Sequence, residues 1–138
     1  MRFLRVLCGS VVVLGLFAAG ATPAFAHHRP TITHQPPPAA KAGQELQLAA
    51  AVEGCTIFCT PVAIRLHYRA PNGSKRVLYK SLGALPLQTV IFKVRSSDVV
   101  SPRFTYWLEA SQNYCWFDAC HGGSDRAPDR GSFGIPTL

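Results

Sequence analysis

The sequence predicts an all-β protein, built as a single antiparallel β-sandwich of about seven strands. The first observation is strict alternation of apolar and polar residues over 62–69, which is typical of a strand with one buried face. The second is that similar segments recur at intervals of roughly ten residues, separated by turns rich in glycine and proline, with no segment at helical spacing. Short strands at this interval indicate a sandwich rather than an α/β fold.

The alternation locates the strands and their buried faces. The clearest strand, 62–69, is expected to bury Val62, Ile64, Leu66 and Tyr68, and 103–111 is expected to bury Phe104, Tyr106, Leu108 and Ala110. Further strands are expected at 44–53, 75–80, 87–95 and 131–137. Connections are expected at 54–61, 70–74, 81–86, 96–102 and 112–129, the last of them a long loop.

Residues 1–26 have the organisation of a cleaved signal peptide. Arg2 and Arg5 precede an apolar stretch at 11–19, and Ala-Phe-Ala at 24–26 forms a small-x-small cleavage site. We therefore expect cleavage after Ala26 and a secreted or periplasmic product. Because no later segment is long and apolar enough to span a bilayer, no stable membrane insertion is expected after cleavage.

Cleavage after residue 26 would leave 112 of the 138 residues, which is enough for one domain. Residues 27–41 contain four prolines and are expected to form an extended lead that runs into an edge strand. The domain proper is expected at 42–138. Without Arg2 and Arg5 the 14 basic residues become 12, against 7 acidic ones. Since these charges are scattered, they indicate a solvated surface, and nucleic acid is not an expected partner.

Three segments together resemble the immunoglobulin-like and fibronectin type III-like domains of bacterial exported proteins. They are Ala-Gly-Gln-Glu-Leu at 42–46, the strand 62–69 with its Pro-Asn-Gly turn, and Phe-Thr-Tyr-Trp-Leu-Glu-Ala at 104–110. The resemblance implies that these segments are the B, C and F strands, and that Tyr106 is a buried tyrosine of the F strand. The antibody pattern of cysteine on B, tryptophan on C and cysteine on F is absent.

Four cysteines remain after cleavage, at Cys55, Cys59, Cys115 and Cys120. An even number in a small exported domain predicts two disulfides, with three possible connectivities. The topology implied by the resemblance would bring the two cysteine-bearing loops to the same end of the sandwich. We favour pairing between the loops, because longer enclosed segments gain more from closure. Local pairing within each loop is the alternative.

Aromatic side chains accompany the cysteines in both loops. The expected binding surface consists of Ile57, Phe58, Tyr114, Trp116 and Phe117. Large rings on a stapled loop provide contact area at little cost in conformational entropy. The expected partner is a protein or a cell-envelope polymer. The alternative interpretation is that these rings pack beneath the loops and cover the core.

Two metal sites are alternatives to this interpretation. The four cysteines with His121 have zinc-like ligand types, although export to an oxidising compartment favours disulfides. Cleavage after residue 26 would also place His27 at the amino terminus, followed by His28, and a terminal amine with an imidazole can chelate copper. Further copper ligands would then come from His34, His67 or His121.

Catalytic signals are weak in this sequence. No serine lies in a nucleophile elbow, and no glycine-rich phosphate loop follows a predicted strand. The sequence therefore predicts a non-enzymatic, exported binding or assembly module of the cell envelope, without a cofactor. A periplasmic copper-binding protein that uses His27 is the alternative.

Overall fold

The computed structural model describes residues 29–83, 86–128 and 131–138. The predicted signal peptide, His27 and His28 therefore lie outside the described residues. The strands are β1 (Thr31–His34), β2 (Leu46–Glu53), β3 (Val62–Arg69), β4 (Lys75–Leu82), β5 (Leu87–Val94), β6 (Arg103–Trp116), β7 (Ala119–Ala127) and β8 (Phe133–Pro136). A single 3₁₀ turn, Ser96–Asp98, is the only helical element in these ranges. None of the helical structure described is long and apolar enough to cross a membrane.

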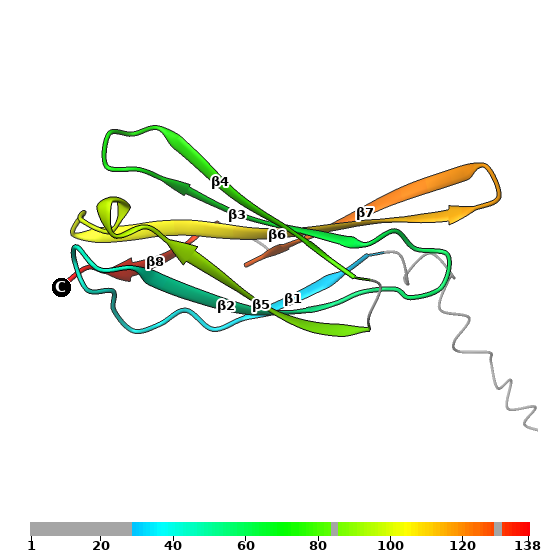
Figure 1. The fold of residues 1–138 in the computed structure, drawn as a ribbon, viewed down its shortest axis with the longest axis horizontal. Coiled ribbons are helices and arrows are strands. Elements are labelled where there is room, and N and C mark those ends of the chain that lie inside the picture. The colour runs from blue at the N-terminus through cyan, green and yellow to red at the C-terminus, as the bar shows by residue number, and fades with distance from the viewer. Residues whose placement is uncertain (1–28, 84–85, 129–130) are drawn as a thin grey trace, which may run out of the picture.

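The strands form two antiparallel sheets that lie one over the other (Figure 1). The smaller sheet has the order β1-β2-β5, and the larger has the order β4-β3-β6-β7, with β8 paired to the first part of β6. The proline-rich lead, expected to be a linker that runs into an edge strand, itself contains the edge strand β1, which pairs with β2. The prediction of an all-β, antiparallel fold is confirmed.

Alternating side chains from both sheets form one core. Along β3 every second residue is buried, as predicted, and Ile64 and Leu66 are completely inaccessible to solvent. The opposite sheet contributes Leu48 and Phe92 to the same cluster. Burying each such side chain stabilises a fold by about 1.5–3 kcal/mol, so the period-two pattern dictates which face of each strand turns inward.

Two tyrosines of the larger sheet direct their hydroxyls to polar partners within the core. Tyr106 is 1% exposed, and its hydroxyl lies 2.6 Å from Nε2 of His34, so the expectation of a buried tyrosine at this position is confirmed. The Tyr68 hydroxyl donates to the buried carboxylate of Asp98 at 2.7 Å. Burial and this hydrogen bond raise the pKa of Tyr68 to about 12.

The predicted long loop at 112–129 is wrong. Strand β6 continues to Trp116, turns, and returns as β7 in continuous register from Leu108–Ala127 to Trp116–Ala119. This hairpin extends beyond the smaller sheet (Figure 1), so its outer part has no facing sheet on which to bury apolar side chains. Because backbone pairing there is not accompanied by burial, the sequence shows no apolar alternation over 119–127.

Candidate functional site: the aromatic tip

The two cysteine-bearing segments lie side by side at one end of the molecule. The segment 54–61 connects β2 to β3, and the β6–β7 turn projects from the same end (Figure 1). The Cys115 N–H donates to the Phe58 carbonyl at 2.7 Å, and the Thr60 N–H donates to the Asn113 carbonyl at 2.8 Å. The segment 54–61 is therefore bound along the edge of β6, and the prediction that both loops share one end is confirmed.

The disulfides are local. Cys55 pairs with Cys59, and Cys115 pairs with Cys120, so pairing between the loops, which we favoured, is wrong. Hydrogen bonds already join the segment 54–61 to β6, and each disulfide instead closes its own turn. With all four cysteines in disulfides, none is a thiolate ligand in this structure, so zinc binding by them would require both disulfides to be reduced.

Four large apolar side chains are exposed at this end, and we call them the aromatic tip: Ile57, Phe58, Trp116 and Phe117. Phe117 is 89% exposed and Trp116 is 47% exposed. The rings of Phe58 and Trp116 meet edge to face at a centroid distance of 4.7 Å, and Trp116 meets Phe117 at 5.2 Å. These side chains project into solvent, so the interpretation that they pack beneath the loops is wrong. Tyr114, the fifth predicted residue, is less exposed, and its backbone forms an isolated antiparallel β-bridge with Cys59.

The two phenylalanines of the aromatic tip have an unusual backbone conformation. Phe58 has φ of 58° and Phe117 has φ of 53°, and they are the non-glycine residues with positive φ among those described. This left-handed region is unfavourable for bulky side chains and costs on the order of 1–3 kcal/mol each. Each phenylalanine lies inside one of the small disulfide rings. The disulfide rings thus hold both backbones in a conformation that phenylalanine intrinsically disfavours.

Gln112, which is not among the predicted site residues, connects β6 to the segment 54–61 beneath the aromatic tip. Its side chain is 2% exposed. Its Oε1 accepts from the Cys55 N–H at 2.9 Å, and its Nε2 donates to the carbonyls of Cys55 and Thr60, each at 2.8 Å. Position 112 continues the inward alternation of 104, 106, 108 and 110. That periodicity was the available signal, but the polar side chain suggested that the strand had already ended.

Each histidine considered as a further copper ligand lies in a different environment. His34 uses both ring nitrogens, at 2.6 Å from the Ala49 carbonyl and 2.6 Å from the Tyr106 hydroxyl. His67 stacks on Trp107, and His121 lies exposed on β7. Among the described residues, no three His, Cys, Asp or Glu side chains form a group suited to a metal ion. Copper binding through His27 and His28 stays a prediction.

Burial shifts the titration of the His34–Tyr106 pair. Desolvation lowers the pKa of His34, although the hydrogen bond to Ala49 partly opposes this, and desolvation raises the pKa of Tyr106 well above its usual value. Both groups are therefore neutral near pH 7. In this state the His34 Nδ1–H donates to the Ala49 carbonyl, and Nε2 accepts from the Tyr106 hydroxyl.

Comparisons with known proteins identify no family. No family model matches the chain, and no curated protein matches it. Two structures of variants of the superoxide reductase (neelaredoxin) from Ignicoccus hospitalis are similar at 16% identity, with TM-scores of 0.47 and 0.45. The first alignment covers 80% of this chain and 81% of the reductase, and the second covers 83% of each. AggA, the major subunit of aggregative adherence fimbriae type I from Escherichia coli, is similar at 13% identity and a TM-score of 0.47, over 79% of this chain and 94% of AggA. Similarity at this level is not evidence for or against a shared activity.

Proposed function

We propose that this protein is a non-catalytic, exported β-sandwich module that binds a protein partner of the cell envelope through the aromatic tip. The observation on which this rests is the pair of exposed phenylalanines, Phe58 and Phe117, held in left-handed backbone conformations inside disulfide rings. Strained backbone of this kind persists where the surrounding structure over-determines it, and it occurs most often at functional sites.

The strand order supports an immunoglobulin-like or fibronectin type III-like domain. Taken in chain order, β1, β2 and β5 correspond to strands A, B and E, and β3, β6 and β7 correspond to C, F and G. The B and E strands pair in one sheet, and the C, F and G strands pair in the other, as in immunoglobulin-like sandwiches. The fourth strand, β4, lies beside β3 in the C-F-G sheet, which is the position of strand C′.

The disulfides support export. Both are compact staples of a small domain, of the kind that forms and persists outside the cytosol. They agree with the predicted signal peptide at 1–26, and each closes a segment that carries part of the aromatic tip. An exported location would keep these cysteines oxidised, and the same two disulfides staple the segments that carry the tip.

The aromatic tip has the properties of a contact surface. Rigid aromatic side chains lose little entropy on binding, and they dominate the energetics of many protein interfaces. Its rings are mutually supported by the two edge-to-face contacts of Trp116, which further limits their freedom before binding. Exposed apolar groups at a projecting end contribute little to the stability of the sandwich itself, so binding is the role that explains their position.

The decisive experiment compares capture of envelope proteins by the wild-type domain and by Phe58→Asn and Phe117→Asn variants. Asparagine tolerates the left-handed conformation better than phenylalanine, so each variant removes a ring without adding backbone strain. Val100→Ala is the matched control, because Val100 is 50% exposed and lies in the connection at the opposite end. We expect one protein to be retained by the wild type and the control and lost with both tip variants.

The thermal stability of the tip variants separates binding from packing. We expect both variants to unfold at or slightly above the temperature of the wild type, because strain is relieved and no buried contact is lost. A marked fall in unfolding temperature would show that the rings stabilise the fold. Undiminished capture by the tip variants would contradict the proposal, and retention of an envelope polymer in place of a protein would replace the proposed partner.

A further inference from the structure

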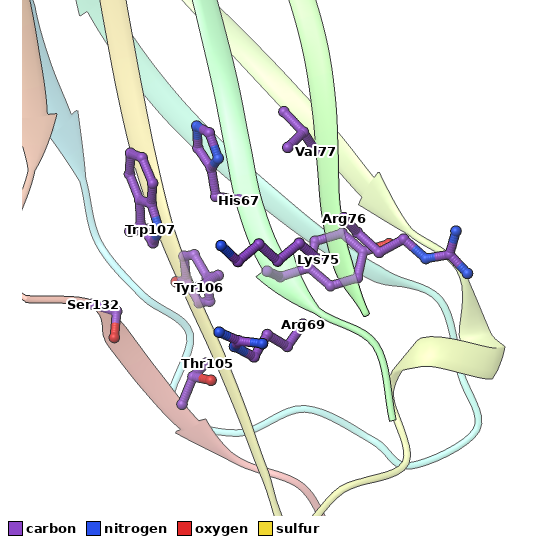
Figure 2. A pocket seen from close by; sticks show the side chains of 10 residues that line it. His67, Arg69, Lys75, Arg76, Val77, Thr105, Tyr106, Trp107 and Ser132 are labelled. Atoms are coloured by element: carbon purple, nitrogen blue, oxygen red, sulfur yellow. The ribbon is translucent and has the colours of Figure 1, made fainter. Parts of the chain in front are cut away.

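A cleft of about 420 Å³ opens on the larger sheet, away from the aromatic tip and toward the β3–β4 turn. Figure 2 shows the cleft and its lining, in which the residues that matter here are His67, Arg69, Lys75, Arg76, Thr105 and Trp107. The charged residues among the lining are all basic, and no carboxylate belongs to it within the part of the chain that the structure describes. The cleft is therefore a concentrated positive region.

Arg69 and Lys75 lie directly opposite each other across β3 and β4. Like charges at directly opposed positions of an antiparallel pair are destabilising. The Arg69 guanidinium donates to the Gly73 carbonyl at 3.0 Å, which provides no neutralising charge and leaves its other N–H groups for a ligand. An anion bound between the two cations would offset their repulsion.

Two other cations on the same sheet, Arg65 and Arg126, have partners. Arg65 lies 3.9 Å from the Glu109 carboxylate and 5.3 Å from the centre of the Tyr79 ring. Arg126 lies 3.9 Å from the centre of the Trp107 ring. Arg69 and Lys75 have no such partner among the described ion pairs, so their charges are less compensated than those of Arg65 and Arg126.

The side chains are directed toward a common point. In Figure 2, Lys75 and Arg69 extend in the same direction across β3 toward β6, and Thr105 of β6 lines the same cleft. Arg76 extends the other way, with its guanidinium directed away from this group. Two cationic donors and a hydroxyl therefore face the same space, and the third cation does not take part.

One wall of the cleft is rigid. The rings of His67 and Trp107 stack in parallel at 3.6 Å with an interplanar angle of 3°. Because His67 comes from β3 and Arg126 from β7, on either side of β6, Trp107 is held between them. A wall fixed in this way requires no ordering when a ligand binds, which favours affinity.

We propose that this cleft binds a phosphate or sulfate ester carried on a sugar-sized molecule, with Arg69 and Lys75 contacting the oxyanion and the Trp107–His67 stack flanking the remainder. Arginine and lysine are the usual partners of such groups, through charge-assisted hydrogen bonds. The cleft volume lies within the range of about 300–1,000 Å³ found for small-molecule sites and exceeds what a free oxyanion needs. The site is distinct from the aromatic tip and does not depend on the function proposed for the tip.

The test is a titration of the ¹⁵N-labelled domain with glucose 6-phosphate and glucose 6-sulfate, alongside glucose and inorganic phosphate. We expect both esters to shift the amide signals of residues 67–76 and 105–107, glucose to shift none, and inorganic phosphate to bind more weakly than the esters. The tighter of the two esters would identify the oxyanion. Failure of both esters to shift these signals, or shifts spread evenly over the surface, would overturn the proposal.

Single substitutions distinguish a specific anion site from a general attraction of anions to this basic surface. Arg69→Gln and Lys75→Gln are each expected to weaken ester binding by about tenfold, because each removes a charge-assisted contact. Arg76→Gln is the matched control, since it removes the same charge from a side chain that points away, and it should weaken binding by less than about twofold. Equal losses in all three variants would overturn the assignment. Without ligand, Lys75→Gln should raise the unfolding temperature, and a fall there would contradict the repulsion between Arg69 and Lys75.

Discussion

Replacing Gln112 by methionine should destabilise the domain and loosen the aromatic tip. Methionine is close to glutamine in size, so the change removes hydrogen bonds without opening a large cavity. Gln112 is 2% exposed and makes three hydrogen bonds to the backbone of Cys55 and Thr60, at 2.8–2.9 Å. The substitution leaves one N–H and two carbonyl groups of the segment 54–61 without these partners.

The expected cost follows from the number of bonds. Each intramolecular hydrogen bond contributes about 1 kcal/mol net, so the three bonds of Gln112 predict a loss of about 3 kcal/mol in the free energy of unfolding. For a domain of this size that corresponds to a fall of about 10–15 °C in the unfolding temperature. The loss should be accompanied by local opening, because Gln112 attaches the segment 54–61 to β6 along with two backbone hydrogen bonds.

Urea unfolding and amide hydrogen exchange together measure this prediction. The matched control is Gln47→Met, because Gln47 lies on the exposed face of β2 and makes one weak side-chain contact, 3.4 Å from Glu45. We expect the control to change stability little and the Cys55 amide to exchange faster only in Gln112→Met. A loss below about 1 kcal/mol with unchanged exchange at Cys55 would refute the reasoning, since it would mean that water or the loop itself satisfies these groups.

Three further predictions concern the disulfides, a histidine and a buried tyrosine. Tryptic digestion without reduction should release peptides 42–65 and 104–126 separately, each lighter by the two hydrogens lost on oxidation, because both disulfides are local; one linked species would contradict this. Because burial lowers the pKa of His34 from 6.5, the stability it contributes should be complete above pH 6.5 and lost as the pH falls through its lowered value. The difference between wild type and His34→Gln in unfolding free energy across this range measures it, and a flat difference would refute it. Tyr68→Phe should cost about 1.5–3 kcal/mol by urea unfolding, because it removes a hydrogen bond to a buried carboxylate, whereas equal effects of Tyr68→Phe and the exposed Tyr79→Phe would show that this bond contributes nothing.

Much of the fold could be predicted where burial determines the sequence. Strand β3 was predicted to the residue, because its alternating side chains are buried against the other sheet. The same holds for the inward positions of β6 as far as Ala110. A one-residue shift in register would turn every apolar side chain of such a strand to solvent, so the sequence there is strongly constrained and easily interpreted.

The candidate site could be predicted in part. The resemblance to immunoglobulin-like domains implied that the loops carrying Phe58, Trp116 and Phe117 share one end of the sandwich, and the structure brings these rings into contact. The hairpin that presents Trp116 and Phe117 was missed, because its strands pair through backbone groups that carry no sequence signal. Gln112 was missed for a related reason, since its partners are backbone atoms more than 50 residues away.

The sequence by itself determined the class of the protein: an all-β chain with antiparallel strands, and four cysteines beside aromatic side chains. These properties are local, because alternation and composition follow directly from which side chains leave water. Only the tertiary structure decided the disulfide pairing, the extent of β6 and β7, and the meeting of Arg69 with Lys75 in a cleft. The physical reason is that these features depend on which strands become neighbours and on how far each sheet extends past the other. The pairing of strands and the extent of each sheet are set by the whole chain and by no single segment of it.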